Sequence, residues 1–306
     1  MPTAPQPEPT PTPLCRLGEN AVLHRLLQLA PPPTGELLLG PGDDCAVVRR
    51  NAEWDTLLKV DALVESIHFT PGTEPRLIGR KALARAVSDI AAMGGLPEHA
   101  LVTLMAHGSR PVETMEGIYA GLAELAAQFG ISLAGGETTS LPHDGLAISI
   151  ALTGRVEAGR AILRSGGQPG DVVCVSGALG GSFASGRHLS FTPRVEMARQ
   201  LATGSLRPRA MMDLSDGLAV DLPRMAQASG CDFELNTAAL PCHPGCTAQQ
   251  ALADGEDYEL LLALPPTAMA HLHAAPAPGL TPIGRLIPGR AHMLTGGWQH
   301  FSPQNS

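Results

Sequence analysis

The chain has 306 residues, of which 44% are hydrophobic and 16% charged, a composition typical of a globular protein rather than a disordered one. Its length favours about two domains, and its net charge of −8 argues against a general binder of nucleic acid or anionic membranes. No apolar stretch approaches the ~20 residues of a transmembrane helix, and the N-terminus lacks the apolar core of a signal peptide. A cytoplasmic protein is therefore expected.

The first part of the chain leads to an acidic turn. Residues 1–17 form a Pro-rich tail that is expected to be disordered, and residues 19–30 predict a short helix that three prolines end. Asp43 and Asp44 then follow a Pro-Gly pair. Neighbouring carboxylates resist ionising together unless a cation lies between them. The turn is therefore either part of a Mg²⁺ site or an ordinary surface turn.

The next stretches predict an α/β unit that extends to residue 156. Strands are expected over 46–49, 55–64, 99–106, 131–134 and 146–154, with helices over 77–93 and 114–129. The fourth strand is expected to break at Gly135-Gly136. Asp89 lies within an Ala-rich helix, where a solvated face is the alternative. Its poor helix propensity and small neighbours favour a buried carboxylate with a partner.

A second unit is expected over residues 157–306, after a glycine-rich linker. Strands are predicted over 171–176, 231–235, 259–264 and 281–286, with helices over 194–203, 218–228, 247–253 and 267–273. The glycine-rich turn over 176–182 is of a kind that cradles phosphate, but it fits neither the dinucleotide fingerprint nor the P-loop. Ser215 or Asp216 alone would suffice to cap the following helix, whereas with Asp213 they offer three oxygen ligands.

Six cysteines are spread along the chain, and a chain of this length does not need disulfides. Cys242 and Cys246 flank a histidine, with Cys231 nearby, which has some character of a zinc site. A second paired element at zinc-finger spacing is missing, so a Pro-rich loop without metal is the default interpretation.

Carboxylates recur at turns and strand ends in apolar, glycine-bounded settings. They are Asp43, Asp44, Asp61, Glu137, Asp213, Asp216, Glu256 and Asp257, with Asp89 on a helix. Carboxylates buried together require cations, and several Mg²⁺ ions with oxygen ligands are the simplest expectation. Several Mg²⁺ ions in turn indicate phosphoryl transfer, in which cations bridge phosphate oxygens.

Six motifs occur in an order that closely resembles the thiamine-monophosphate kinase family, over about residues 18–301. They are Gly42-Asp43-Asp44, Asp61 with His68-Phe69, Ser88–Gly94, Gly135–Thr139, Met212–Leu218 and Gly255–Leu260. The resemblance implies ATP-dependent phosphorylation of thiamine phosphate to thiamine diphosphate, in an aminoimidazole ribonucleotide synthetase-like fold. It implies a homodimer in which residues 18–156 form a β-barrel with their copy. Residues 157–306 would form an α/β domain that completes the site for ATP and substrate.

The resemblance also implies the residues of the site. The implied Mg²⁺ ligands are Asp43, Asp44, Asp61, Asp89, Glu137, Asp213 and Asp216, with Asp43 preferred over Asp44. The implied ATP contacts are Tyr119, Gly136, Glu137, Arg164 and Ser215, and the implied thiamine phosphate contacts are His68, Glu256 and Trp298. No general base is expected, because the nucleophile is a phosphate oxygen whose second pKa lies near ~6.

The sequence departs from the family pattern at two positions, and the roles of several residues and the function itself have alternatives. Glu137 stands where the family usually has Asp, and Val60 stands where a hydroxyl residue is common. His68 is either a substrate contact or a structural histidine, and Trp298 either stacks on the substrate or packs at the C-terminus. The competing functions are another ATP-dependent synthetase of the superfamily and a non-catalytic nucleotide- or thiamine diphosphate-binding protein. Cys15 lacks the context of a selenophosphate synthetase cysteine, and the hydrogenase-maturation relative would need a C-terminal cysteine.

Overall fold

The computed structural model describes residues 12–33, 35–268, 279–298 and 300–301. Its contacts divide the chain into two compact units, residues 35–297 and residues 1–34 with 298–306, which are described separately.

The smaller unit holds a short 3₁₀ helix, η1 (Leu14–Arg16), and the helix α1 (Glu19–Leu27). Helix α1 ends three residues earlier than the leucine pattern predicts. Trp298 in this unit is 36% exposed and meets His300 edge-on, with ring centroids 6.1 Å apart. Most of the tail expected to be disordered, residues 1–11, lies outside the described residues.

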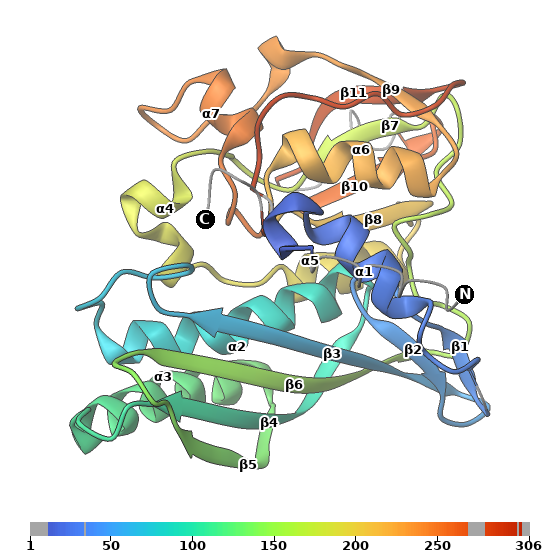
Figure 1. Ribbon diagram of the computed structural model, residues 1–306. Coiled ribbons are helices and arrows are strands. Elements are labelled where there is room, and N and C mark those ends of the chain that lie inside the picture. The colour runs from blue at the N-terminus through green and yellow to red at the C-terminus, as the bar shows by residue number, and fades with distance from the viewer. Residues whose placement is uncertain (1–11, 34, 269–278, 299, 302–306) are drawn as a thin grey trace, which may run out of the picture. The chain divides into compact units, whose positions relative to one another are not determined.

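The first half of the larger unit forms a six-stranded sheet (Figure 1). Its strands are β1 (Leu37–Leu39), β2 (Ala46–Arg49), β3 (Trp54–Val64), β4 (Leu96–Ala106), β5 (Ser132–Ser140) and β6 (Leu146–Glu157). Their order is β1-β2-β3-β6-β4-β5, and every pair is antiparallel except β4 with β5. Burial alternates along the whole of β6, as expected for a strand with only one face against a core.

Helices α2 (Pro75–Ala92) and α3 (Val112–Phe129) cover the buried face of this sheet. They approach closely because glycines lie at their contact. A Cβ atom on Gly79 would lie 1.9 Å from the Ile118 carbonyl oxygen, and one on Gly121 would lie 1.9 Å from that of Arg76. Helix α2 also contacts α5 and β8 of the second half, so its side chains reach both halves of this unit.

The second half forms a five-stranded antiparallel sheet in the order β8-β10-β7-β11-β9. Its strands are β7 (Val172–Val175), β8 (Ala210–Asp213), β9 (Asp232–Leu235), β10 (Leu260–Leu264) and β11 (Thr281–Ile287). Its helices are α4 (Ser182–Ser185), η2 (Arg187–Leu189), α5 (Val195–Thr203), α6 (Leu218–Ala228), η3 (Thr237–Ala239) and α7 (Ala248–Ala253). Strand β10 is buried at every position, and its apolar run matches its place inside the sheet, between β8 and β7.

The predicted α/β architecture is confirmed, with one strand corrected and two strands missed. Strand β5 does not break at Gly135-Gly136 but continues from Ser132 to Ser140. Gly136 allows this because it lies against β4, where a Cβ atom would meet the Val102 carbonyl oxygen at 1.8 Å. The short strands β1 and β8 were not predicted. The helix predicted over 267–273 falls largely outside the described residues.

The expected boundary between residues 156 and 157 lies where the first sheet ends and the second half begins. Both sheets belong to one compact unit, so division into two domains stays a prediction. Among the described helices, none is both long enough and apolar enough to cross a membrane. All six cysteines lie within the described residues and are free thiols.

Candidate active site

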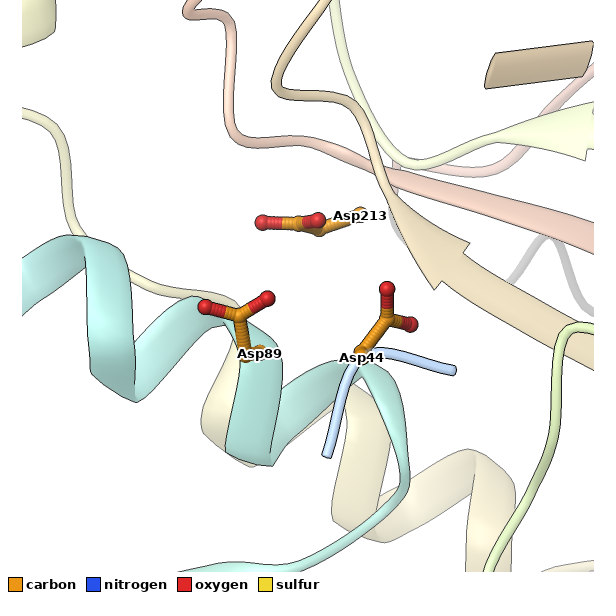
Figure 2. A group of neighbouring side chains, drawn as sticks. All are labelled: Asp44, Asp89 and Asp213. Atoms are coloured by element: carbon orange, nitrogen blue, oxygen red, sulfur yellow. The ribbon is translucent and has the colours of Figure 1, made fainter. Parts of the chain in front are cut away.

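Three aspartates from distant parts of the chain converge within the larger unit (Figure 2). Asp44 lies on the turn before β2, Asp89 on α2, and Asp213 at the end of β8. One carboxylate oxygen from each lies within 4.8 Å of the others, and all three residues are buried. We call these residues the aspartate triad.

The aspartate triad and its neighbour Asp43 carry more negative charge than the cations beside them offset. Burial raises the pKa of Asp89 well above its ordinary value, although Lys59 lies beside it. Burial and the charge of Asp44 raise the pKa of Asp213 to about 7 and that of Asp43 to about 6. These shifts mean that the ionised carboxylates are poorly stabilised by what surrounds them.

One oxygen of the aspartate triad is also unsatisfied. Among the described residues, Oδ2 of Asp44 is buried and has no hydrogen-bond partner. A buried carboxylate oxygen without a partner is costly unless a ligand completes it. An oxygen-only donor set with excess negative charge fits a hard divalent cation such as Mg²⁺.

Arg164 links the acidic turn to the second half of the unit. Its guanidinium forms an ion pair with Asp44, and its backbone N–H donates to Asp43 Oδ2 over 3.1 Å. Asp43 also accepts the N–H of Asp44 over 2.9 Å. Asp44 belongs to the triad and Asp43 lies beside it. The sequence preferred Asp43 as the Mg²⁺ ligand, and which of the two binds the ion stays a prediction.

Two further predicted ligands have cationic partners of their own. Asp61 lies 3.2 Å from Nη2 of Arg85 on α2. Asp216 lies 2.5 Å from Nη1 of Arg224, and its backbone N–H donates to the fully buried Asp221 over 3.0 Å. Neither of these two carboxylates belongs to the aspartate triad.

A second polar cluster surrounds Glu256. This residue has a φ of 63°, and its Oε2 lies 2.5 Å from Nζ of Lys81 and 3.0 Å from Nδ1 of His188. Lys81 is fully buried, and burial, only partly offset by Glu256, lowers its pKa to about 8. Burial works to raise the pKa of Glu256, but the His188 hydrogen bond and the Lys81 charge outweigh it and hold the pKa below its usual range.

His68 borders the same cluster through its backbone. Its carbonyl oxygen accepts a hydrogen bond from Lys81 Nζ over 2.5 Å, and its Nδ1 accepts the backbone N–H of Val64 over 3.0 Å. An accepting Nδ1 requires a neutral ring. Burial, reinforced by nearby Arg85, lowers the pKa of His68 to about 4, so the ring is neutral at physiological pH.

The predicted ATP contacts fall into separate places. Tyr119 on α3 and Gly136 and Glu137 on β5 line a cavity of about 320 Å³, apart from the group formed by the triad. Ser215 is half-buried, and its carbonyl oxygen accepts the N–H of Glu256 over 2.7 Å. The structure thus brings Arg164 to the triad, whereas the predicted ATP contacts Tyr119, Gly136 and Glu137 line a cavity that no residue of the triad lines.

The structure does not support a phosphate site in the glycine-rich turn or a zinc site at the cysteine cluster, the two further sites considered from the sequence. The N–H groups of Gly180 and Gly181 in the glycine-rich turn donate to Asp257 and Asp254 over 2.8 and 2.7 Å, so carboxylates already occupy them. Among the described residues, the aspartate triad is the one group of metal-ligand type, and Cys231, Cys242 and Cys246 form none.

Sequence reasoning missed the role of both lysines. Lys59 lies 2.8 Å from Asp89, and Lys81 lies 2.5 Å from Glu256. A signal was present for Lys59, because these are the only two lysines in the chain and Lys59 lies among apolar residues of a predicted strand. An ammonium group in such a setting requires a carboxylate partner.

Residues 42–156 match the family model described as AIR synthase related protein, N-terminal domain, and the two sheets with their helices define an AIR synthase-like protein. Curated thiamine-monophosphate kinases are similar over most of the chain. The protein from Rhodopirellula baltica is 34% identical, with 87% of each chain covered, and that from Mycobacterium tuberculosis is 32% identical, with 95% of this chain and 94% of the relative covered. The chain therefore belongs to the thiamine-monophosphate kinase family.

Solved structures agree with this assignment. The structure "AaThiL complexed with AMPPCP and TMP" is 29% identical and covers 95% of this chain and 99% of its own, with a TM-score of 0.83. Thiamine monophosphate kinase from Aquifex aeolicus is 28% identical, covers 88% and 94%, and has a TM-score of 0.74. The hydrogenase maturation protein HypE in complex with ATP, at 18% identity and a TM-score of 0.67, shares the fold.

Proposed function

We propose that this protein transfers the γ-phosphoryl group of ATP to thiamine phosphate and so forms thiamine diphosphate. The observation that carries the proposal is the convergence of Asp44, Asp89 and Asp213 with Arg164 in a chain of this family. Related structures support it, since AaThiL is complexed with AMPPCP and TMP.

The chain's own residues would bind and align the reactants. The aspartate triad offers a hard oxygen site for Mg²⁺, which when bound neutralises charge on phosphate oxygens. Arg164 lies at the edge of this site, where its guanidinium suits a planar contact to phosphate. The main barrier is repulsion between a dianionic acceptor and ATP, so positioning and charge neutralisation account for catalysis.

We further propose that Glu256 contacts the thiamine part of the substrate. Its carboxylate is 17% exposed, carries a lowered pKa and is held by Lys81 and His188. An ionised carboxylate suits a ligand that carries a cationic ring. His68, Trp298 and the remaining predicted contacts stay predictions, as do Mg²⁺ ligation by Asp43, Asp61, Asp216 and Glu137.

A homodimer is proposed because one face of the first sheet exposes apolar side chains. Val60 of β3 is 68% exposed and Leu101 of β4 is 50% exposed, and both pair in register with Ala151 of β6. Leu58 and Val64 extend this face along β3 at 43% and 37% exposure. The other face carries α2 and α3, so a second copy would cover the exposed one.

The cytoplasm is the proposed location. The six free thiols are consistent with a reducing compartment, and ATP is a cytoplasmic reactant.

The direct test incubates the protein with ATP, Mg²⁺ and thiamine phosphate and separates the products by chromatography. Thiamine diphosphate and ADP in equal amounts are expected, and EDTA should prevent both. Nucleotide binding without product would contradict the kinase proposal and favour a non-catalytic binding protein. Phosphate released into solution without thiamine diphosphate would instead favour a related ATP-dependent enzyme.

A further inference from the structure

Lys59 is the feature of the site that the proposed function does not use. Strand β3 points alternate residues to opposite faces, and Lys59 and Asp61 are less exposed than Leu58, Val60 and Ala62 between and around them. Lys59 and Asp61 thus lie toward α2. Nζ of Lys59 lies 2.8 Å from Oδ1 of Asp89 on that helix.

The ammonium of Lys59 acts on more than one carboxylate. Its charge favours ionisation of Asp89 and Asp213. Burial works to lower the pKa of Lys59, but the charges of Asp89 and Asp61 outweigh it and raise that pKa. Only 22% of the Lys59 side chain is exposed, so solvent screens these interactions little. A fixed positive charge therefore stands at one side of the aspartate triad.

Two arginines contribute further positive charge, because Arg164 pairs with Asp44 and Arg85 pairs with the neighbouring Asp61. Within the described residues, the carboxylates in this network are Asp43, Asp44, Asp61, Asp89 and Asp213, and the cations paired with them are Lys59, Arg85 and Arg164. With every carboxylate ionised, as ligation of a metal ion requires, five negative charges against three positive ones leave a net charge of −2. One divalent cation neutralises that charge, whereas several would over-neutralise it.

We propose that the Lys59 ammonium takes the place of a divalent cation beside Asp89 and Asp61, so that the nucleotide-free chain binds one divalent ion, at the aspartate triad. This inference rests on the metal site of the proposed function and narrows the several Mg²⁺ ions expected from the sequence. Asp89 serves both cations, because Lys59 engages Oδ1 and the carboxylate still offers a second oxygen. Further ions would arrive only with the phosphates of the nucleotide.

The test counts Mn²⁺ bound to the full chain without ATP or thiamine phosphate, by equilibrium dialysis with electron paramagnetic resonance of the free ion. Wild type is expected to bind one Mn²⁺ per chain. Lys59→Arg keeps the charge and should also bind one, whereas Lys59→Met should bind two. Asp213→Asn should bind none, which places the ion at the triad. Arg285→Met removes one positive charge from an exposed pair with Glu234 and should match wild type.

Two or more ions on wild type would overturn the inference, as would a single ion on Lys59→Met. Circular dichroism checks that each variant is folded. If Lys59→Met does not fold, the counts for wild type and Lys59→Arg still decide, because the inference requires one ion in each. Since neither substrate is present, absence of kinase activity with these counts intact would refute the proposed function alone.

Discussion

Ser88 Oγ donates a hydrogen bond to Oδ2 of Asp213 over 2.6 Å, and this bond joins α2 of the first half to β8 of the second. The two residues are 125 positions apart in the chain, and both are buried. The contact fixes the direction of the Asp213 carboxylate relative to Asp89, which follows Ser88 on the same helix. One hydroxyl thus positions two members of the triad against each other.

Removing this hydroxyl should destabilise the protein. Ser88→Ala leaves a buried carboxylate oxygen without its donor, and hydrogen bonds to charged groups contribute about 1.5 to 3 kcal/mol. The free energy of unfolding in urea should fall by that amount. Ser109→Ala, an exposed serine bonded to His107, is the control and should change it by less than about 0.5 kcal/mol. Equal stabilities of the two variants would contradict a positioning role for Ser88.

Asp213→Asn should separate catalysis from folding. The amide oxygen can still accept from Ser88, while the uncompensated buried charge is removed, so stability should be unchanged or higher. Loss of charge at the site should lower kcat by about 100-fold or more. The control is Asp144→Asn, whose side chain is 73% exposed in a pair with Arg110 and which should retain full activity. Full turnover in Asp213→Asn would refute the proposed metal site.

The pair of Lys81 and Glu256 should show strong coupling. Lys81→Met leaves Glu256 without its ammonium partner in a buried setting and should cost about 3 to 5 kcal/mol of stability. The double variant Lys81→Met/Glu256→Gln should recover most of this loss, which a double-mutant cycle in urea measures. The exposed pair of Arg285 and Glu234 should couple by no more than about 1 kcal/mol. If the changes in unfolding free energy of the two single variants add up to that of the double variant, Lys81 and Glu256 are not coupled, which would contradict this prediction.

His68 should make stability depend on pH. Its pKa falls from 6.5 in the unfolded chain to about 4 in the fold, so the unfolded state binds more protons between these values. Its contribution is complete above pH 6.5 and is lost as the pH falls toward 4. Between pH 7.5 and 4.5 wild type should lose about 2 to 3 kcal/mol more than His68→Asn, whose amide cannot be protonated. Parallel losses in urea unfolding at the two pH values would contradict a buried neutral ring.

The apolar face of the first sheet should set the oligomeric state. Val60→Glu or Leu101→Glu puts a carboxylate into the proposed contact between copies and should convert dimers to monomers in sedimentation velocity. Val112→Glu is a matched control, because Val112 is 62% exposed at the start of α3. A monomeric wild-type chain, or dimers in all three variants, would contradict the proposed face.

The sequence by itself determined the alternating strands and helices, because hydrophobic periodicity reflects which face of each element is buried. It also indicated that Asp89 is buried, since a carboxylate among alanines in a helix needs a partner. The glycines of β5 misled it: Gly136 was taken as a strand break, whereas it permits a close approach of β5 to β4.

Only the tertiary structure decided which charges meet. Contacts between side chains that lie far apart in the chain cannot be inferred from local pattern. The sequence therefore could not show that Asp44 rather than Asp43 joins the triad, or that Glu137 lines a cavity with Tyr119 and Gly136. The pairing of Lys59 with Asp89 and of Lys81 with Glu256 likewise depends on how α2 packs. These pairs fix the net charge of the site, because electrostatic energy depends on separation and burial rather than on residue type alone.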